Sequence, residues 1–188
     1  TGGVNRTEEH RVDASGKGGV VPNLDPLRRR IGLTLAVNGS LYVSYFVSIN
    51  GTKLGAVAEL DLAGSEMNVL EGLDKPVGVL AVGSDLFVSE QVANRIVVAP
   101  IGMPEQVAVR AQLDTPDLLC QGPEGSMFTG GKSGSVRRIG ADGKVSEQAG
   151  GFQEIRGVAY DAANKRLFLS DHDPNESNGF THKLQIIP

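Results

Sequence analysis

The chain has 188 residues and a formal net charge of -4 at pH 7. Its 25 glycines, set against no tryptophan and 5% aromatic residues, predict many short strands separated by turns. The acidic balance disfavours nucleic acid and anionic membrane surfaces as partners, because both require a broad basic face. No apolar run approaches the roughly 18 residues of a membrane span. We therefore expect an all-β protein with no nucleic-acid or membrane partner.

The single cysteine, Cys120, excludes an intramolecular disulfide and a thiolate metal cluster. Because it follows Leu118 and Leu119, we expect a buried structural thiol and not a nucleophile. Four Asn-x-Ser/Thr acceptor sequences occur, at Asn5, Asn38, Asn50 and Asn175. They permit a secretory route, and a secreted or periplasmic location is slightly favoured.

One sequence pattern recurs along the chain: an apolar run, a turn with Gly or Asp, then a bulky apolar pair, a Val, Thr or Leu, and a small residue. The closing tetrads are Leu41–Ser44, Leu86–Ser89, Met127–Gly130 and Leu167–Ser170. Their first residues are 45, 41 and 40 positions apart, from 41 to 86, 86 to 127 and 127 to 167. Such a period, made of short strands and tight turns, is typical of the four-stranded blades of a β-propeller. A β-sandwich is the alternative, but it does not repeat one blade pattern four times.

The second copy predicts all four strands of a blade, over residues 77–82, 86–89, 95–100 and 106–111. Its first strand is a continuous apolar run, as expected for an inner strand buried on both faces. Its last strand alternates apolar and polar residues, as expected for an outer strand. The third copy has the same order of strands and turns.

The predicted organisation is one β-propeller domain over residues 1–188. Its blades are expected at residues 31–73, 74–113, 114–152 and 153–188. Residues 1–30 are expected to form a closing strand or a partial blade. Two alternatives stay open: a compact four-bladed ring closed by its amino-terminal strand, or part of a six-bladed propeller that a second chain completes.

Two stretches resemble known propeller families. The sequence of Glu90–Val97 resembles the Asp…Asn-Arg-Ile portion of NHL-type repeats, with Glu90 in place of the usual acid. Thr115–Asp117 and Met127–Gly131 resemble the Pro-Asp-Gly turn and the following strand of the gluconolactonase/regucalcin family. Both families are typically six-bladed, so the resemblance implies that about two blades are missing from this chain.

The second resemblance implies a metal-dependent chemistry. Gluconolactonase-like enzymes hold one divalent cation with a Glu, two Asn and an Asp, and the metal polarises the lactone carbonyl and activates water. Asp117 matches the position of that Asp, although Leu118 replaces the Gly that follows it. The chain has Val77 where an Asn is expected and Ile31 where the Glu is expected. One ligand position of four is therefore matched.

In a propeller, the loops that enter the first strand and leave the second open on one face, around the central channel. We expect a ligand to contact Glu90, Asn94, Lys132 and Arg156 at this mouth. A calcium or zinc ion, if one is bound, is expected at Asp117, Asp171 and Asp173. The candidate catalytic residues are Asp117 and His172, the latter as a general base beside Asp171 or Asp173.

No sequence motif identifies a reaction, so whether the chain is an enzyme stays open. The stretch from 171 to 178 is similar to an oxygen-ligand calcium loop, but Glu176 occupies the position that needs Gly. The first hypothesis is a propeller that binds a protein, peptide or polar small ligand on its top face. The alternative is a metal-dependent hydrolase or lactonase like the gluconolactonase/regucalcin family. RNA binding, a third hypothesis, is disfavoured by the acidic balance.

Overall fold

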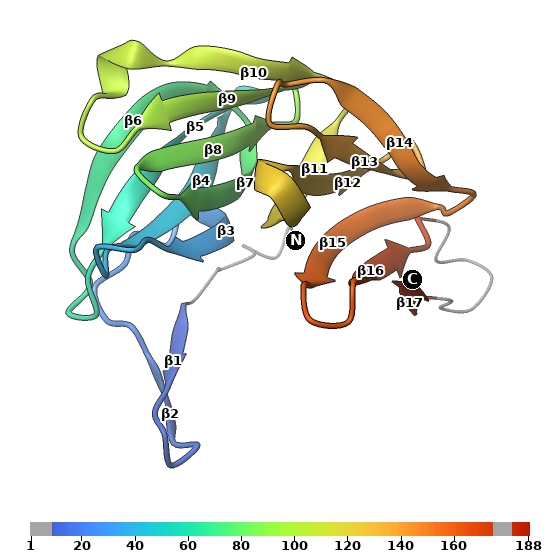
Figure 1. Ribbon diagram of the computed structural model, residues 1–188. Coiled ribbons are helices and arrows are strands. Elements are labelled where there is room, and N and C mark those ends of the chain that lie inside the picture. Colours follow the sequence, from blue (N-terminus) through green and yellow to red (C-terminus); the bar gives the residue numbers. More distant parts are fainter. Residues whose placement is uncertain (1–8, 175–181) are drawn as a thin grey trace.

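The computed structural model describes residues 9–174 and 182–188, and nearly all of its regular structure is β-strand. Figure 1 shows sheets that follow one another along an arc, with a two-stranded hairpin that projects away from it. The hairpin consists of β1 (His10–Val12) and β2 (Gly18–Val20). Within the described residues, no helix is long and apolar enough to span a membrane.

Blades 1 and 2 are four-stranded antiparallel sheets. The strands of blade 1 are β3 (Arg29–Leu35), β4 (Leu41–Ile49), β5 (Thr52–Leu60) and β6 (Glu66–Asp74). Those of blade 2 are β7 (Pro76–Val82), β8 (Asp85–Glu90), β9 (Arg95–Pro100) and β10 (Ala108–Gln112). The outer strand β10 begins at 108 and not at 106, because a short 3-10 helix, η1 (Pro104–Gln106), occupies the preceding residues.

Blades 3 and 4 follow in the same order. Blade 3 contains β11 (Pro116–Gln121), η2 (Pro123–Gly125), β12 (Met127–Gly131), β13 (Ser135–Ile139) and β14 (Val145–Gly150). Blade 4 contains β15 (Glu154–Asp161), β16 (Arg166–His172) and β17 (Lys183–Ile187). A single bridge between Gly131 on β12 and Ile155 on β15 joins the two blades. The inner strands β3, β7, β11 and β15 lie side by side in this order, which is the arrangement of a β-propeller.

Local turn chemistry separates the strands. Asn50 and Gly51 both have positive φ, 50° and 83°, in the two-residue connection between β4 and β5. An Asn-Gly pair favours this type I′ turn, whose twist matches that of the flanking strands. Asp61 caps the β5–β6 connection by accepting hydrogen bonds from the amides of Ala63 and Ser65, each 2.9 Å long. These two turns connect successive antiparallel strands of blade 1.

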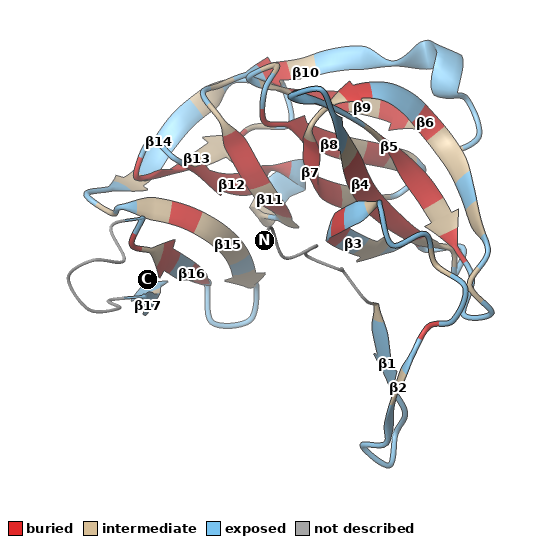
Figure 2. Ribbon diagram, turned by 180° about the vertical axis from the view of Figure 1, so that it is seen from behind, coloured by how far each residue is buried: buried red, intermediate tan, exposed pale blue. Residues whose placement is uncertain are grey.

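The hydrophobic core lies mainly between neighbouring blades. Between blades 1 and 2 it includes Val57, Leu73, Val88 and Val97. Between blades 2 and 3 it includes Ile96, Leu119, Met127 and Ile139. Between blades 3 and 4 it includes Val136, Ile155, Leu167 and Leu169. Figure 2 shows this burial along the inner and middle strands, whereas β10 and β14 are largely exposed.

The two ends of the arc differ from its middle. Leu33 and Leu35 on β3 are 52% and 67% exposed, and Leu184 on β17 is 73% exposed. The hairpin strands β1 and β2 pair with each other, and no pairing among the described residues joins either of them to β17. The division of the chain into domains, the closing role of residues 1–30 and a second chain that completes the propeller stay predictions.

Candidate functional site

The inner strand of every blade carries a β-bulge at the same place. In blade 1 the register passes from Arg30–Tyr45 to Leu33–Val43, so that two residues oppose Ser44 alone. The registers of β7 with β8, β11 with β12 and β15 with β16 shift in the same way. A bulge re-aims a side chain. One bulge residue from each blade lines a common cavity at the channel mouth: Ile31, Val77, Asp117 and Arg156.

Serine hydroxyls set the distance between neighbouring inner strands. The Ser89 hydroxyl accepts a 2.7 Å hydrogen bond from the Gly78 amide of its own blade and donates one of 2.7 Å to the carbonyl of Asp117 in the next blade. Ser44 makes the same bridge to the carbonyl of Val77, 2.6 Å away. A Cβ on Gly78 would lie 2.7 Å from the Asp117 carbonyl oxygen, so the position requires glycine. Ser44 and Ser89, which end the first two tetrads, are therefore spacers between neighbouring blades.

The cavity measures about 420 Å³. Besides the four bulge residues, it is lined by Arg29, Phe46, Lys53, Lys75, Gln91, Leu118 and His172. Among the lining residues, all of which belong to the described part of the chain, Asp117 is the single acidic one. Four arginine and lysine side chains therefore make the wall of this cavity cationic.

Lys75 lies at the junction of blades 1 and 2, and both its amide and its carbonyl form backbone hydrogen bonds. Its amide donates to the carbonyl of Lys53 (2.8 Å), and its carbonyl accepts from the amide of Gln91 (3.1 Å). Its φ is 49°, and Thr115 at the next junction has φ of 40°, so the left-handed conformation belongs to the junction geometry. The ammonium donates to the Gln91 side-chain oxygen.

Asp117 and Arg156 form the polar wall of the cavity. Asp117 is 3% exposed, and its Oδ2 accepts hydrogen bonds from Arg156 (2.9 Å) and from the Gln91 amide nitrogen (3.2 Å). Arg156 also donates to Glu154. Burial raises the pKa of Asp117, and the Arg156 guanidinium opposes that rise. A continuous network therefore runs from Lys75 through Gln91, Asp117 and Arg156 to Glu154.

Glu90 and Asn94, two of the predicted ligand contacts, are hydrogen-bonded within the protein, and ligand contact at either residue stays a prediction. Glu90 is fully buried, and its carboxylate accepts from Arg95 (2.5 Å) and from the amide of Asp74 (2.8 Å). The Asn94 side chain accepts from the amide of Thr115 (2.8 Å). Neither residue lines the cavity. Lys132 is exposed and lies outside the lining, but its charge helps to lower the pKa of Lys75.

The residues at the end of β16 lie at one side of the cavity. His172 lines it and stacks on His182, with ring centroids 4.6 Å apart. Asp171 is 7% exposed and accepts a 2.9 Å hydrogen bond from the amide of Gln153. Asp171 lines a neighbouring pocket with His172 and His182, whereas the amide of Asp173 donates to Nδ1 of His182 (3.3 Å).

The described residues contain no cluster of three or more potential metal ligands. Oδ2 of Asp117 accepts from the Arg156 guanidinium and from the Gln91 side-chain amide. Asp171 does not line the cavity that contains Asp117. A cation at Asp117, Asp171 and Asp173, and catalysis by Asp117 or His172, stay predictions. Residues 175–178 of the calcium-loop-like stretch, with Glu176, lie outside the described residues.

The sequence indicated Arg156 at this mouth, but not Arg29, Lys53 and Lys75. Lys75 precedes Pro76 as Thr115 precedes Pro116, so alignment of the two junctions was the signal that could have placed it. Two residues of the arginine run 28–30 have distinct places in the fold. Arg30 is buried against Glu66, with Nε 2.6 Å from Oε1, and Arg29 lines the cavity.

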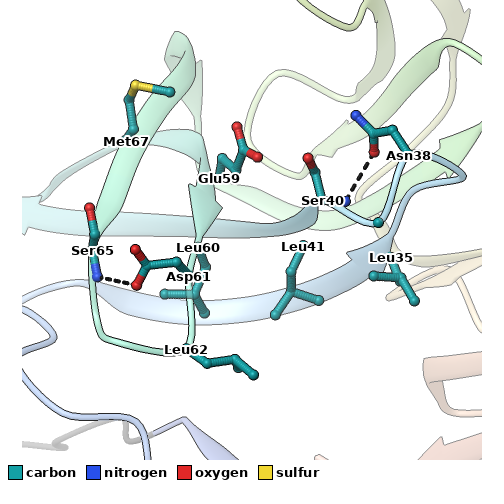
Figure 3. Close-up of a pocket in the computed structure, with 11 residues that line it drawn as sticks. Leu35, Asn38, Ser40, Leu41, Glu59, Leu60, Asp61, Leu62, Ser65 and Met67 are labelled. Atoms are coloured by element: carbon teal, nitrogen blue, oxygen red, sulfur yellow. Dashed lines mark hydrogen bonds between the residues drawn. The ribbon is translucent and has the colours of Figure 1, made fainter.

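A larger cavity, of about 710 Å³, lies between the β3–β4 and β5–β6 turns of blade 1. Figure 3 shows that leucine side chains and Met67 line much of it. The side-chain oxygens of Asn38 and Asp61 accept hydrogen bonds from the amides of Ser40 and Ser65. Because these polar groups serve their own turns, the channel mouth is the better candidate for ligand chemistry.

No protein-family model matches the sequence, and no curated protein matches it. Among solved structures, a chain of the nidogen/laminin complex matches with a TM-score of 0.73 and 18% identity, over 97% of this chain and 70% of that chain. A gluconolactonase from Xanthomonas campestris matches with a TM-score of 0.72 and 19% identity, over 95% and 64%. The calcium-binding protein regucalcin from Agrobacterium tumefaciens matches with a TM-score of 0.66 and 14% identity, over 97% and 82%.

At these identities the similarities show the fold alone. They confirm the predicted β-propeller, and they place gluconolactonase-like and regucalcin-like propellers among its structural neighbours. This chain spans between 64% and 82% of the length of the three structures.

Proposed function

We propose that this propeller binds a small anionic ligand, of which a carboxylate is the simplest form, in the channel-mouth cavity. The observation that carries the proposal is the convergence of Arg29, Lys53, Lys75 and Arg156 on one cavity with a single lining carboxylate. That carboxylate, Asp117, already accepts two hydrogen bonds on one oxygen. The lining therefore contains three more positively charged side chains than carboxylates.

The volume of the cavity and the aromatic ring of Phe46 in its wall support a small ligand. A cavity of about 420 Å³ is within the usual range for small-molecule sites. Phe46 lies under two of the cations, with the Arg29 guanidinium 5.7 Å and the Lys75 ammonium 5.9 Å from its ring centre. An aromatic ring with two cations beside it suits a ligand that has a short apolar part and a negatively charged end.

Calorimetry with a series of small carboxylates tests the proposal, with neutral amides of the same shape as controls. Lys53→Gln should weaken carboxylate binding about three- to tenfold, because one partly screened charge contact is removed. Lys144→Gln is the matched control, since Lys144 is exposed in the β13–β14 turn and lies outside the cavity. Equal affinity for carboxylates and amides would contradict an anion site.

A peptide or protein with an acidic side chain is a second form of the same ligand. The nidogen/laminin complex is a protein assembly with a structurally similar propeller, which supports testing acidic peptides beside small carboxylates. Saturation of the cavity by a small carboxylate should then block peptide binding in a competition experiment.

The metal-dependent lactonase is the second candidate function. Its support is the position of Asp117 and the gluconolactonase and regucalcin among the structural neighbours. A divalent cation at Asp117 would face the guanidinium of Arg156 directly, and the charge of Lys75 also acts on this carboxylate. Titration with Ca²⁺ and Zn²⁺, combined with a lactone hydrolysis assay on the wild type and Asp117→Asn, decides between the two candidates.

A further inference from the structure

We propose that Lys75 is a nucleophilic amine that forms an imine with the carbonyl carbon of a 2-oxo acid held in the channel-mouth cavity. The inference rests on the proposed function, because the cationic wall binds the carboxylate of this ligand. It adds a covalent step and a substrate class to the binding site.

Lys75 is held in a fixed position at the cavity. Its backbone is fixed between two strands by hydrogen bonds to Lys53 and Gln91. Its side chain is half-buried and lines the cavity, with Nζ 5.9 Å from the centre of the Phe46 ring. The nitrogen donates to the side-chain oxygen of Gln91, and a neutral amine donates to this amide oxygen as an ammonium does. The amine is thus held in the cavity in either protonation state.

Positive charges surround the Lys75 amine. Lys53 and Arg156 line the same cavity, and Lys132 lies near it. Burial lowers the pKa of Lys75, and the positive charges of these three residues lower it further, whereas Asp117 raises it. Burial and neighbouring cations are the two conditions that make a lysine a nucleophile near neutral pH.

The cationic wall and the amine together suit the two functional groups of a 2-oxo acid. In a 2-oxo acid the carbonyl carbon is bonded directly to the carboxylate carbon. In the proposed complex, Arg29 and Lys53 pair with the carboxylate, and Lys75, which lines the same cavity, attacks the adjacent carbonyl carbon. Simple aldehydes lack the carboxylate, and simple carboxylates lack the electrophilic carbon. The site therefore favours molecules that carry both groups.

The step is balanced without an oxidant or reductant. The Nζ lone pair attacks the carbonyl carbon, and the C=O π electrons move to oxygen. Proton transfer from nitrogen to this oxygen gives the carbinolamine. Loss of the oxygen as water then forms the C=N bond, so that one amine and one ketone give one imine and one water molecule.

Reductive trapping tests the proposal. The full chain is incubated with pyruvate and sodium cyanoborohydride at pH 7, and the modified lysine is identified by peptide mass mapping. The lowered pKa of Lys75 leaves more of this amine neutral at pH 7 than of an exposed lysine, and the cavity holds the ligand beside it. We therefore expect Lys75 to be modified about tenfold faster than any other lysine.

Two variants and one second ligand make the result specific. Lys75→Arg keeps the positive charge but removes the nucleophile, and should abolish the fast modification, whereas Lys144→Arg should leave it unchanged. Lactate has the same carboxylate with a hydroxyl in place of the carbonyl, and its binding is measured by calorimetry. If lactate binds but trapping is absent or equal at all lysines, the imine is wrong and the anion site stands. If neither lactate nor pyruvate binds and nothing is trapped, both proposals are wrong.

The thermal midpoint of Lys75→Arg, together with its lactate affinity, shows whether a loss of trapping reflects chemistry or unfolding. If this variant does not fold, the mapped position of the label in the wild type decides the question alone.

Discussion

The guanidinium of Arg156 donates a 2.9 Å hydrogen bond to the carboxylate of Asp117, and so joins the bulge of β15 to the bulge of β11. Asp117 is 3% exposed, whereas the Arg156 side chain is 38% exposed. Because the carboxylate has been removed from water, its stability in the ionised form depends on this partner.

Arg156→Ala should destabilise the protein by about 1–3 kcal/mol at pH 7, since it leaves a buried carboxylate without its charged donor. Without Arg156, the pKa of Asp117 should rise further above its ordinary value. The carboxyl then binds a proton in the folded state at a pH where the unfolded chain does not, so the loss of stability should shrink as the pH falls toward 4. Urea unfolding at several pH values measures both effects. Arg166→Ala, at the exposed start of β16, is the control and should be nearly neutral at both ends of the pH range.

Gly78→Ala should destabilise the chain by about 1–3 kcal/mol, because a Cβ there meets the carbonyl of Asp117 at 2.7 Å and the hydroxyl of Ser89 at 2.9 Å. Gly18→Ala in the hairpin is the matched control, since its nearest neighbouring atom would be 3.9 Å away. Denaturant midpoints compare the two variants. Equal effects at both positions would contradict the role of Gly78 as a spacer between inner strands.

Carboxylate binding should weaken as the pH rises through the lowered pKa of Lys75. Above that pKa the amine is neutral, and the cavity has lost one of its charges. Since the pKa of Lys75 lies below the ordinary 10.5, the weakening should occur at a lower pH than the titration of an exposed lysine. Affinities measured by calorimetry between about pH 7 and 10 test this. Lys75→Arg keeps its charge over the whole range and should show a flatter profile; identical profiles would contradict the role assigned to Lys75.

Cys120 should react slowly with thiol reagents while the chain is folded. Burial raises the pKa of its thiol to about 11, from 9.0. At pH 8 this reduces the reactive thiolate roughly 100-fold relative to the unfolded chain. The alkylation rate with iodoacetamide, compared in buffer and in denaturing urea, measures the difference. A rate in buffer close to that in urea would show that Cys120 is accessible, contrary to its place beside Phe128 in the core between blades 3 and 4.

The sequence by itself determined the fold. Tetrads such as Leu86–Ser89, repeated at intervals of 40 to 45 residues, encode strand periodicity and turn chemistry, which act over a few neighbouring residues and can be recognised without a structure. It also indicated the face on which Asp117, Arg156 and His172 lie. Strand order alone places the starts of the inner strands and the ends of the second strands at one mouth.

Only the tertiary structure decided what surrounds these residues. The bulges that turn Val77 and Asp117 toward the cavity depend on pairing between strands, and the pattern of apolar residues does not specify them. Glu90 could not be assigned to Arg95, nor Lys75 to the cavity, because charged side chains are placed by partners in space and not by their own sequence neighbours. The chain as a whole is acidic, but its channel mouth is basic, because net charge is a sum over the sequence and a binding site depends on how those charges are arranged in space.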